Sequence, residues 1–273
     1  MTVLDNIRER LSTFSHAIGR RAGKIRRRLD VAPPVLIYQM GKVGSSSIYR
    51  SLKPIWPGLT MHTHFITRDA KKSQTAHIIY ERAIRPGRPI FVISPVREPI
   101  ARNVSTFFQN FECETGIKYQ NSTFSVNDLI QFFLRQFKHY DALRWFDNRF
   151  RVELGLDVYD YAFPASGSAV ISHQNIKLLL MRSELPDEVK ENAIRNFLEL
   201  PHFVLSNTNS SAEKDYSEMY RQFKHTFVPP KWYFEAMYGS RFFNHFYDAV
   251  QRAMFIAHWT QQEPAQSNVG FSE

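Results

Sequence analysis

The residues of this chain with the clearest chemical potential lie in a short turn over residues 41–47, with the sequence GKVGSSS. The turn follows an apolar run over residues 35–40 that predicts a buried strand, and its serines open a predicted helix. The first-turn amides of such a helix have no intrahelical acceptor, and the helix dipole adds partial positive charge there. Lys42 adds a full charge and the serines add hydroxyl donors. Together they predict a site for a phosphate or a related anion.

This turn matches a nucleotide-binding P-loop only in part. In the GxxxxGK[ST] pattern the lysine stands directly before the Ser/Thr that binds magnesium. Here the lysine comes early, the loop is about three residues shorter, and that Ser/Thr has no clear equivalent. A tight strand-to-helix turn with a surface lysine is the alternative interpretation.

A second pair of anion-binding candidates follows the predicted strand over residues 89–95. Arg97 comes just after this strand, and Ser105 lies about two helical turns further on, so both can face the same side. A guanidinium group at the carboxyl edge of a parallel sheet can bind a phosphate with two hydrogen bonds. In the alternative interpretation, Arg97 pairs with Glu98 or Asp69 and Ser105 is only a small helix residue.

Two histidines provide a candidate general base. His62 and His64 belong to the predicted strand over residues 59–65, and their spacing of two places them on one face. A histidine at the end of this strand can accept a proton near neutral pH. Packing of these rings against aromatic residues is the alternative, and a zinc site is disfavoured because no third ligand lies nearby in the sequence.

Composition and charge narrow the class of protein. The 273 residues are 43% hydrophobic, as in a folded globular protein. No apolar run reaches the roughly 18 residues of a membrane span, and the single cysteine, Cys113, excludes an intrachain disulfide. Of the net charge of +9, residues 1–30 carry +5, so the remainder is only mildly basic. This balance favours small anionic ligands over nucleic acid.

The order of the predicted elements indicates an α/β fold in which a parallel sheet is covered on both faces. We expect residues 33–260 to form one domain, preceded by a basic amphipathic helix within residues 1–32 and followed by a flexible tail over residues 261–273. The predicted strands cover residues 35–40, 59–65, 89–95, 177–182 and 202–206. The predicted helices cover residues 68–84, a segment from Pro99, and residues 125–150, 187–199 and 231–258.

The two anion-binding elements resemble those of the PAPS-dependent sulfotransferases, where PAPS is 3′-phosphoadenosine-5′-phosphosulfate. The strand followed by GKVGSSS is similar to their 5′-phosphosulfate loop, and VREPIARNVSTFF is similar to their 3′-phosphate element. Blocks in residues 145–163, 177–185 and 231–247 are most similar to bacterial sulfotransferase-like proteins assigned to capsular polysaccharide synthesis. The resemblance spans most of residues 35–250 and implies a P-loop-like three-layer fold with a central parallel sheet.

The resemblance also implies a reaction. A sulfuryl group would move from PAPS, as co-substrate and without a metal ion, to a hydroxyl of a carbohydrate or polysaccharide acceptor. His64 is then the base, by similarity to the His-x-His segment of uronyl 2-O-sulfotransferases, with His62 in reserve and Lys42 also catalytic. The residues assigned to PAPS are Lys42, Val43, Gly44, Ser45, Ser46, Ser47, Arg97, Ser105 and Lys214.

Two other functions stay open at this point, a P-loop kinase for a small metabolite and a non-catalytic nucleotide-binding relative in glycan assembly. The acceptor is equally open, since a glycolipid, a small alcohol or a protein tyrosine also offers a hydroxyl. The amphipathic helix can contact an anionic membrane surface, associate with a second copy, or pack on its own domain. We expect a cytoplasmic protein, with membrane association as one role of that helix.

Overall fold

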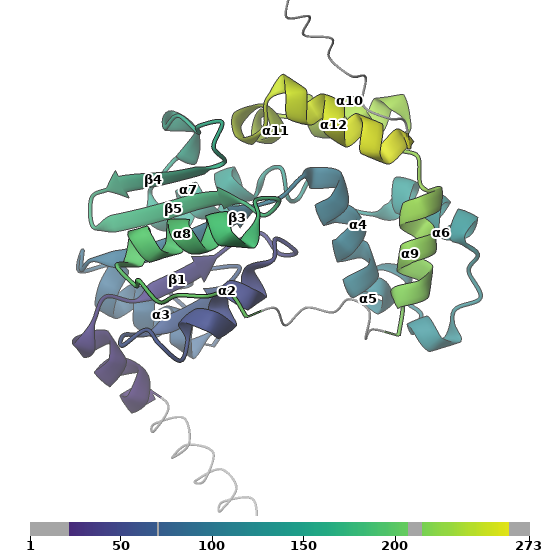
Figure 1. Cartoon of the computed structure of the whole chain (residues 1–273). Coiled ribbons are helices and arrows are strands. Elements are labelled where there is room, and N and C mark those ends of the chain that lie inside the picture. Colours follow the sequence, from purple (N-terminus) through teal and green to yellow (C-terminus); the bar gives the residue numbers. More distant parts are fainter. Residues whose placement is uncertain (1–21, 70, 207–214, 262–273) are drawn as a thin grey trace, which may run out of the picture. The chain divides into compact units, whose positions relative to one another are not determined.

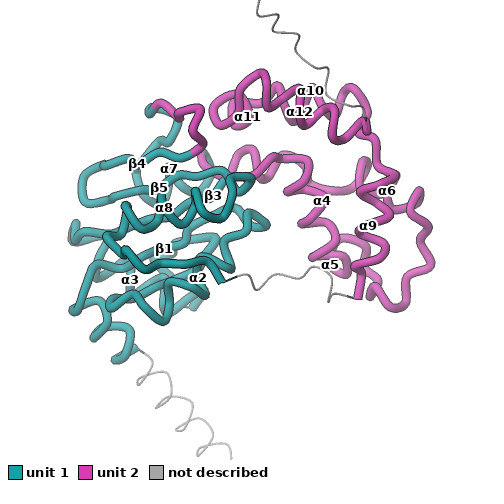
Figure 2. The backbone as a smooth tube through the Cα atoms, in the orientation of Figure 1, with its two compact units in different colours: residues 1–96, 147–161, 168–208 teal, residues 97–146, 162–167, 209–273 magenta. Residues whose placement is uncertain are grey.

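The structure, a computed structural model, describes residues 22–69, 71–206 and 215–261. The chain forms two compact units that are interleaved along the sequence (Figure 2). Unit 1 comprises residues 1–96, 147–161 and 168–208, and unit 2 comprises residues 97–146, 162–167 and 209–273. Residues 33–260, expected to form one domain, contribute to both units.

Unit 1 is built on a five-stranded sheet with the order β2-β1-β3-β5-β4 (Figure 1). Its strands are β1 (Val35–Tyr38), β2 (Thr60–Thr63), β3 (Ile90–Val96), β4 (Ser168–His173) and β5 (Ile176–Arg182). Four strands are parallel, and β4 pairs antiparallel with β5 at the edge. The predicted α/β class with a central, mostly parallel sheet is confirmed.

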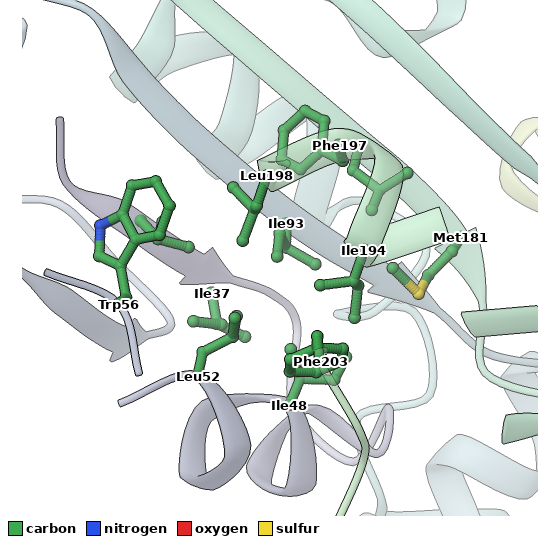
Figure 3. Close-up of a cluster of buried hydrophobic side chains, with 12 residues drawn as sticks. Ile37, Ile48, Leu52, Trp56, Ile93, Met181, Ile194, Phe197, Leu198 and Phe203 are labelled. Atoms are coloured by element: carbon green, nitrogen blue, oxygen red, sulfur yellow. The ribbon is translucent and has the colours of Figure 1, made fainter. Parts of the chain in front are cut away.

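Helices cover both faces of this sheet. All four residues of β1 are therefore buried, which explains why its sequence is a continuous apolar run. On one face, α2 (Ser45–Leu52) and α8 (Asp187–Leu198) contribute Ile48, Leu52 and Ile194 to a buried cluster that includes Ile37 of β1 (Figure 3). Neighbouring strand residues point to opposite faces, so Tyr38 faces the other way. There its ring stacks on Phe150, with the ring centroids 5.3 Å apart.

The segments that complete unit 1 are short. They are α3 (Gln74–Ile79), the π-helical turns η1 (Tyr80–Ile84) and η3 (Phe146–Phe150), α7 (Arg151–Leu154) and the 3₁₀ turn η4 (Val158–Asp160). The helix predicted over residues 68–84 begins only at Gln74, because the Ser73 hydroxyl caps it by accepting from the Ala76 amide at 3.3 Å.

The strand predicted over residues 202–206 is wrong. This segment pairs with no strand among the described residues, because side chains satisfy its backbone groups. The amides of Leu205 and Ser206 donate to Glu191 and Ser51, each at 2.8 Å. The buried Phe203 ring instead fills the core cluster beneath α8.

No strand is predicted over residues 168–173, where β4 forms a hairpin with β5 through Gln174 and Asn175. Gln174 has a positive φ of 51°, as tight hairpin turns require. β4 is an edge strand with only Ile171 fully buried, so its sequence lacks the continuous apolar run of the central strands.

Unit 2 is helical. Its helices are α4 (Pro99–Gln109), α5 (Phe111–Thr115), α6 (Val126–Gln136), α9 (Ser217–Thr226), α10 (Lys231–Tyr238), α11 (Arg241–Phe246) and α12 (Ala249–Thr260), with a 3₁₀ turn η2 (Tyr119–Asn121). Its core is aromatic: the buried Phe133 ring lies 5.4 Å from Phe107, 5.6 Å from Phe223 and 5.5 Å from Phe227, measured between centroids.

The helix predicted over residues 125–150 is interrupted. It begins where Ser125 and Asp128 form a capping box, and it ends at Phe137, whose backbone is extended. Beyond it, the buried His139 ring reaches back to the Phe133 carbonyl, with Nε2 at 2.8 Å. The same carbonyl also accepts from the Phe137 amide at 3.3 Å, so His139 adds a second partner at the end of α6.

The basic helix at the start of the chain is described only from residue 22, and it continues to residue 31. Here Ile25 and Leu29 are buried, and Arg28 donates to the Trp56 carbonyl at 3.0 Å. This part therefore packs on unit 1, whereas the rest of residues 1–30 and the tail from residue 262 lie outside the described residues. Among the described residues, no helix is long and apolar enough to span a membrane.

Candidate functional site

The turn after β1 has an unusual backbone. Gly41, Lys42 and Gly44 all have positive φ values, of 89°, 62° and 73°. Glycine adopts this left-handed region readily, but in a lysine it costs about 1–3 kcal/mol. A tight turn with such residues can point successive amides toward one concavity, which is a known way to bind an anion.

The amino end of α2 is open. Gly44 occupies the N-cap position without a side-chain hydrogen bond, and the first turn contains no acidic residue. The helix contains eight residues, enough for its dipole to add positive charge to the amides of its first turn. The predicted strand, glycine turn and helix are thus present in unit 1, with donors that suit a phosphate-like group.

The three serines of the predicted site differ in what their hydroxyls contact. The buried Ser45 Oγ lies 2.8 Å from His62 Nε2, and Ser47 Oγ donates to the Gly44 carbonyl at 2.8 Å. Ser46 is half-buried. The hydroxyls of Ser45 and Ser47 therefore already have partners within the protein. These two residues would contact an anion mainly through their backbone amides.

The two histidines lie together, as predicted from their spacing. β1 and β2 are in parallel register with Ile37 opposite His62, and the rings of His62 and His64 have centroids 5.9 Å apart. Gln39 lies between them: its Nε2 is 3.1 Å from His62 Nε2 and 3.0 Å from His64 Nδ1. The Gly41 amide donates to Gln39 Oε1, which orients this amide and links the histidines to the turn.

The environments of the two rings differ. His62 stacks on Tyr49 of α2, with centroids 5.6 Å apart, and burial together with the nearby His64 lowers its pKa to about 4. His62 is therefore neutral at pH 7, and its Nε2 accepts hydrogen bonds from Ser45 and Gln39. His64 is exposed, and its Nδ1 lies 2.9 Å from the Gln39 carbonyl. Two tautomers fit these contacts. With the proton on Nδ1, the ring donates to the backbone carbonyl of Gln39 and Nε2 presents a lone pair; with the proton on Nε2, Nδ1 accepts from the Gln39 side-chain nitrogen.

Ser183, directly after β5, connects the turn to the end of β3. Its hydroxyl lies 2.7 Å from the Val43 carbonyl and 2.8 Å from the Val96 carbonyl, and its amide donates to the Val96 carbonyl at 2.7 Å. Val43 itself is buried. The turn is thus fixed to the carboxyl edge of the sheet, where parallel α/β sheets bind their ligands.

The second predicted anion element begins unit 2. Arg97 follows the last residue of β3, and Ser105 lies within α4. Glu98 caps α4, since its carboxylate accepts from the amides of Ile100 at 2.7 Å and Ala101 at 2.6 Å. The Glu98 carboxylate is therefore already used by backbone amides, and the amino end of α4 already holds a negative charge. The roles of Arg97 and Ser105 as phosphate ligands stay predictions. Lys214, also predicted to bind the phosphate, lies outside the described residues.

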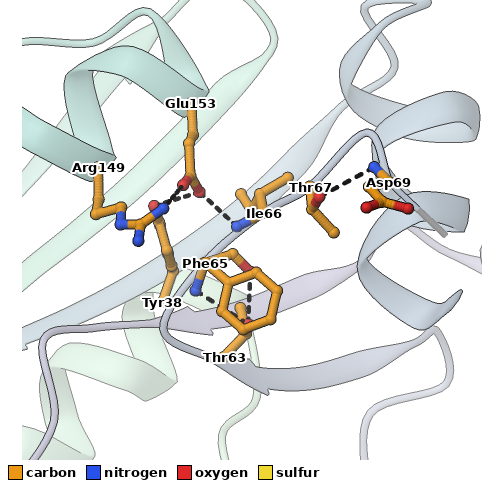
Figure 4. Close-up of polar contacts among 8 residues, drawn as sticks. All are labelled: Tyr38, Thr63, Phe65, Ile66, Thr67, Asp69, Arg149 and Glu153. Carbon is orange, nitrogen blue, oxygen red and sulfur yellow. Dashed lines mark hydrogen bonds and ion pairs between the residues drawn. The ribbon is translucent and has the colours of Figure 1, made fainter. Parts of the chain in front are cut away.

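Glu153 of α7 holds the segment that follows His64 (Figure 4). Its carboxylate accepts from the Tyr38 hydroxyl at 2.7 Å and from the Ile66 amide, and it pairs with Arg149 at 3.3 Å. Burial and the bond to Glu153 raise the pKa of Tyr38, which keeps its hydroxyl protonated as a donor. This network holds the segment after β2 in position, and with it the exposed ring of His64, two residues before Ile66.

Sequence reasoning missed Gln39, Ser183 and Glu153. Gln39 is a buried polar residue directly after β1. The parallel register of β1 and β2, continued by one residue, places it beside His64. Ser183 and Glu153 act across long sequence separations and gave no local signal. Among the described residues, no three His, Cys, Asp or Glu side chains gather as metal ligands.

Comparison with known proteins gives one finding. The family model NKWYS, described as "Putative capsular polysaccharide synthesis protein", matches residues 120–248, just under half of the chain. No curated protein and no solved structure matches. The matched segment includes Glu153 and Ser183 but not the turn or the histidines. The predicted similarity to proteins of capsular polysaccharide synthesis is thus confirmed for this segment, and the similarity to sulfotransferases stays a prediction.

Proposed function

We propose that this protein is a PAPS-dependent O-sulfotransferase that modifies a hydroxyl of a carbohydrate acceptor. One observation carries the proposal: within unit 1, an open helix terminus preceded by Lys42 is joined through Gln39 to a histidine pair. The first feature suits the anionic part of a donor, and the second suits proton removal from an acceptor.

In the proposed reaction, the acceptor oxygen attacks the sulfur of PAPS in line with the bond to the 5′-phosphate. That S–O bond breaks, and adenosine 3′,5′-bisphosphate leaves with the bonding electrons. Because charge accumulates on the leaving phosphate oxygen, Lys42 and the amides of residues 44–47 would stabilise the transition state. Positioning and charge stabilisation dominate in loose transfers of this kind.

His64 is the proposed base. Its ring is exposed, and in the tautomer that donates from Nδ1 to the backbone carbonyl of Gln39, Nε2 would take the proton of the acceptor hydroxyl. His62 suits this role less, because its pKa of about 4 makes it a weak base and its Nε2 already faces Ser45. We assign His62 to positioning.

Arg97, Ser105 and Lys214 are proposed to hold the 3′-phosphate of the donor, by their resemblance to the family element. A carbohydrate acceptor is supported by the family description that covers residues 120–248. Cytoplasmic localisation, with or without membrane contact through residues 1–30, belongs to the proposal because a chain with the single cysteine Cys113 suits a reducing compartment.

The test is transfer of labelled sulfate from PAPS to polysaccharide and oligosaccharide acceptors, with His64→Asn as the variant. We expect this variant to lose transfer but to keep its calorimetric affinity for adenosine 3′,5′-bisphosphate. His202→Asn, an exposed histidine elsewhere in unit 1, is the matched control and should behave as wild type.

The outcomes separate the alternatives. Binding of ATP with magnesium and phosphate transfer would replace the proposal with a kinase. Tight bisphosphate binding without transfer to any acceptor would support a non-catalytic relative. Loss of transfer in His62→Asn but not in His64→Asn would reverse the assignment of the base.

A further inference from the structure

Unit 2 contains a hollow of about 360 Å³ that lies outside every site described above. It is formed by the end of α4, the start of α5, the turn η2 and the two residues directly before α9. Its volume falls at the lower end of the range of about 300–1,000 Å³ that is usual for small-molecule sites. These segments lie together in the part of unit 2 that contains α4, α5 and α9 (Figure 2).

The hollow has an aromatic floor and aromatic walls. Phe108 and Phe111 are buried beneath it, and Tyr119 and Tyr216 are half-buried at its sides. Tyr119 lies edge-on to Phe111 and Tyr216, with centroid distances of 5.4 and 6.3 Å. Tyr216 contacts Phe108 at 5.9 Å. Because these rings are fixed by one another, their accessible faces are rigid before any ligand arrives.

Polar groups surround this aromatic surface. Glu112, Gln109, Gln120 and Asp215 are exposed and line the hollow, and Gln120 Nε2 donates to the Asp215 carboxylate. Carboxylates accept hydrogen bonds and amides both donate and accept them. Burial and the nearby carboxylates raise the pKa of Tyr119, so its hydroxyl stays protonated.

The charge of the lining differs from that of the whole chain. None of the described residues that line the hollow is basic, and two are acidic, although the chain carries a net charge of +9. A phosphate, sulfate or uronate would face two carboxylates without a cationic partner. A quaternary ammonium group would suit the rings and the charge, but its N-methyl groups present no hydrogen-bond donors to the amide and carboxylate groups.

A sugar ring satisfies all of these features. It has an apolar face of C–H groups that can lie on an aromatic ring, and hydroxyls around its edge that pair with carboxylates and amides. We propose that this hollow binds an uncharged sugar residue of a glycan. The binding rests on unit 2 alone, and only the role of that glycan as acceptor rests on the proposed function.

The experiment uses the full chain and an array of neutral, amino-sugar and uronate oligosaccharides, without PAPS. We expect wild type to bind neutral oligosaccharides, and Tyr119→Ala to weaken that binding by about tenfold or more, as removal of a central aromatic contact does. Tyr140→Ala, an exposed tyrosine of unit 2 away from the hollow, is the matched control and should bind as wild type.

Gln120→Ala is the second variant, since an exposed amide can be removed without disturbing the aromatic core. We expect it to weaken neutral-sugar binding severalfold, with near-ultraviolet circular dichroism unchanged. Equal binding by wild type, Tyr119→Ala and Gln120→Ala would overturn the proposal. Absence of neutral-sugar binding, or binding confined to uronates or to choline chloride, would also overturn it.

The same variants separate this proposal from the proposed enzyme. Neutral-sugar binding that depends on Tyr119, in a protein without sulfuryl transfer, would contradict only the enzyme. Sulfuryl transfer to a glycan with an unchanged KM in Tyr119→Ala would contradict only the hollow as the acceptor site.

Discussion

The two strand-to-helix junctions that the sequence marks as anion sites are built differently. At the junction of β1 and α2, Gly44 leaves the helix terminus without a side-chain cap and Lys42 adopts a left-handed backbone. At the junction of β3 and α4, the buried Glu98 carboxylate already accepts from the first amides of the helix. The first terminus is therefore available to an external anion, and the second is satisfied by the chain itself.

This difference shows that a strand followed by a helix is not by itself a binding site. The residue at the N-cap decides whether the amides of the first turn are satisfied internally. A phosphate held near α4 would depend on side chains such as Arg97 and Ser105 rather than on the helix terminus. A phosphate at α2 would use backbone amides as well as Lys42.

Removal of Lys42 should have the largest effect. Lys42→Gly is expected to slow sulfuryl transfer by about 10²–10³-fold, the usual loss when a donor to the developing charge is removed. Glycine also relieves the left-handed strain, so the free energy of unfolding should not fall. Lys53→Ala removes the same charge from the other end of α2 and is the control in the rate measurement. Equal rates in Lys42→Gly and wild type would remove Lys42 from the mechanism.

Removal of the cap on α4 should come next. Glu98→Ala is expected to lower the free energy of unfolding in urea by about 2 kcal/mol, because it deprives buried amides of their acceptor. Asp248→Ala removes the exposed cap of α12 and should cost about 1 kcal/mol. If Glu98→Ala were no less stable than Asp248→Ala, the internal satisfaction of α4 would be refuted.

The pH dependence of stability should report on His62. Its pKa is about 4 in the folded protein and near 6.5 in the unfolded chain, so the unfolded state binds more protons between these values. Stability should therefore fall as the pH decreases from about 6.5 toward 4. His62→Gln keeps an acceptor but does not titrate, and its unfolding should depend less on pH. Identical pH profiles of the two proteins would contradict the neutral, buried state of His62.

The smallest effect is expected from Ser183. Ser183→Ala removes the hydroxyl that lies near the Val43 and Val96 carbonyls and should destabilise the protein by about 1 kcal/mol. Because the turn is then held less firmly, affinity for adenosine 3′,5′-bisphosphate should also decrease by a small factor. Ser172→Ala, exposed on β4, should change neither quantity. A Ser183→Ala protein with unaltered stability and affinity would show that this link is unimportant.

The sequence predicts the part of the fold whose signals are local. The apolar run before Gly41, the glycine turn and the serines that open α2 lie within a few residues of one another, and the structure places them as expected. The histidine pair also follows from strand geometry, because residues two apart share a face. By contrast, β4 is an edge strand with mixed polarity, and the segment around Phe203 is apolar without being a strand.

Long-range partners could not be predicted. Glu153 contacts Tyr38 across 115 residues, and Ser183 contacts Val43 across 140. The aromatic hollow combines Phe108, Tyr119 and Tyr216, and helical spacing in any one segment indicates only a buried face. Such residues acquire their roles from the fold, so a single sequence carries little signal for them.

The central claim is that the open terminus of α2 binds the anionic end of the donor. The most direct measurement is calorimetric titration of adenosine 3′,5′-bisphosphate into wild type, Gly44→Asp and Gly44→Asn. Both residues tolerate a left-handed backbone, there is space for a Cβ at this position, and the two variants differ only in charge. Our account predicts binding that is at least about tenfold weaker in Gly44→Asp than in Gly44→Asn, because a fixed carboxylate repels the phosphate. Equal affinity in the two variants would contradict it.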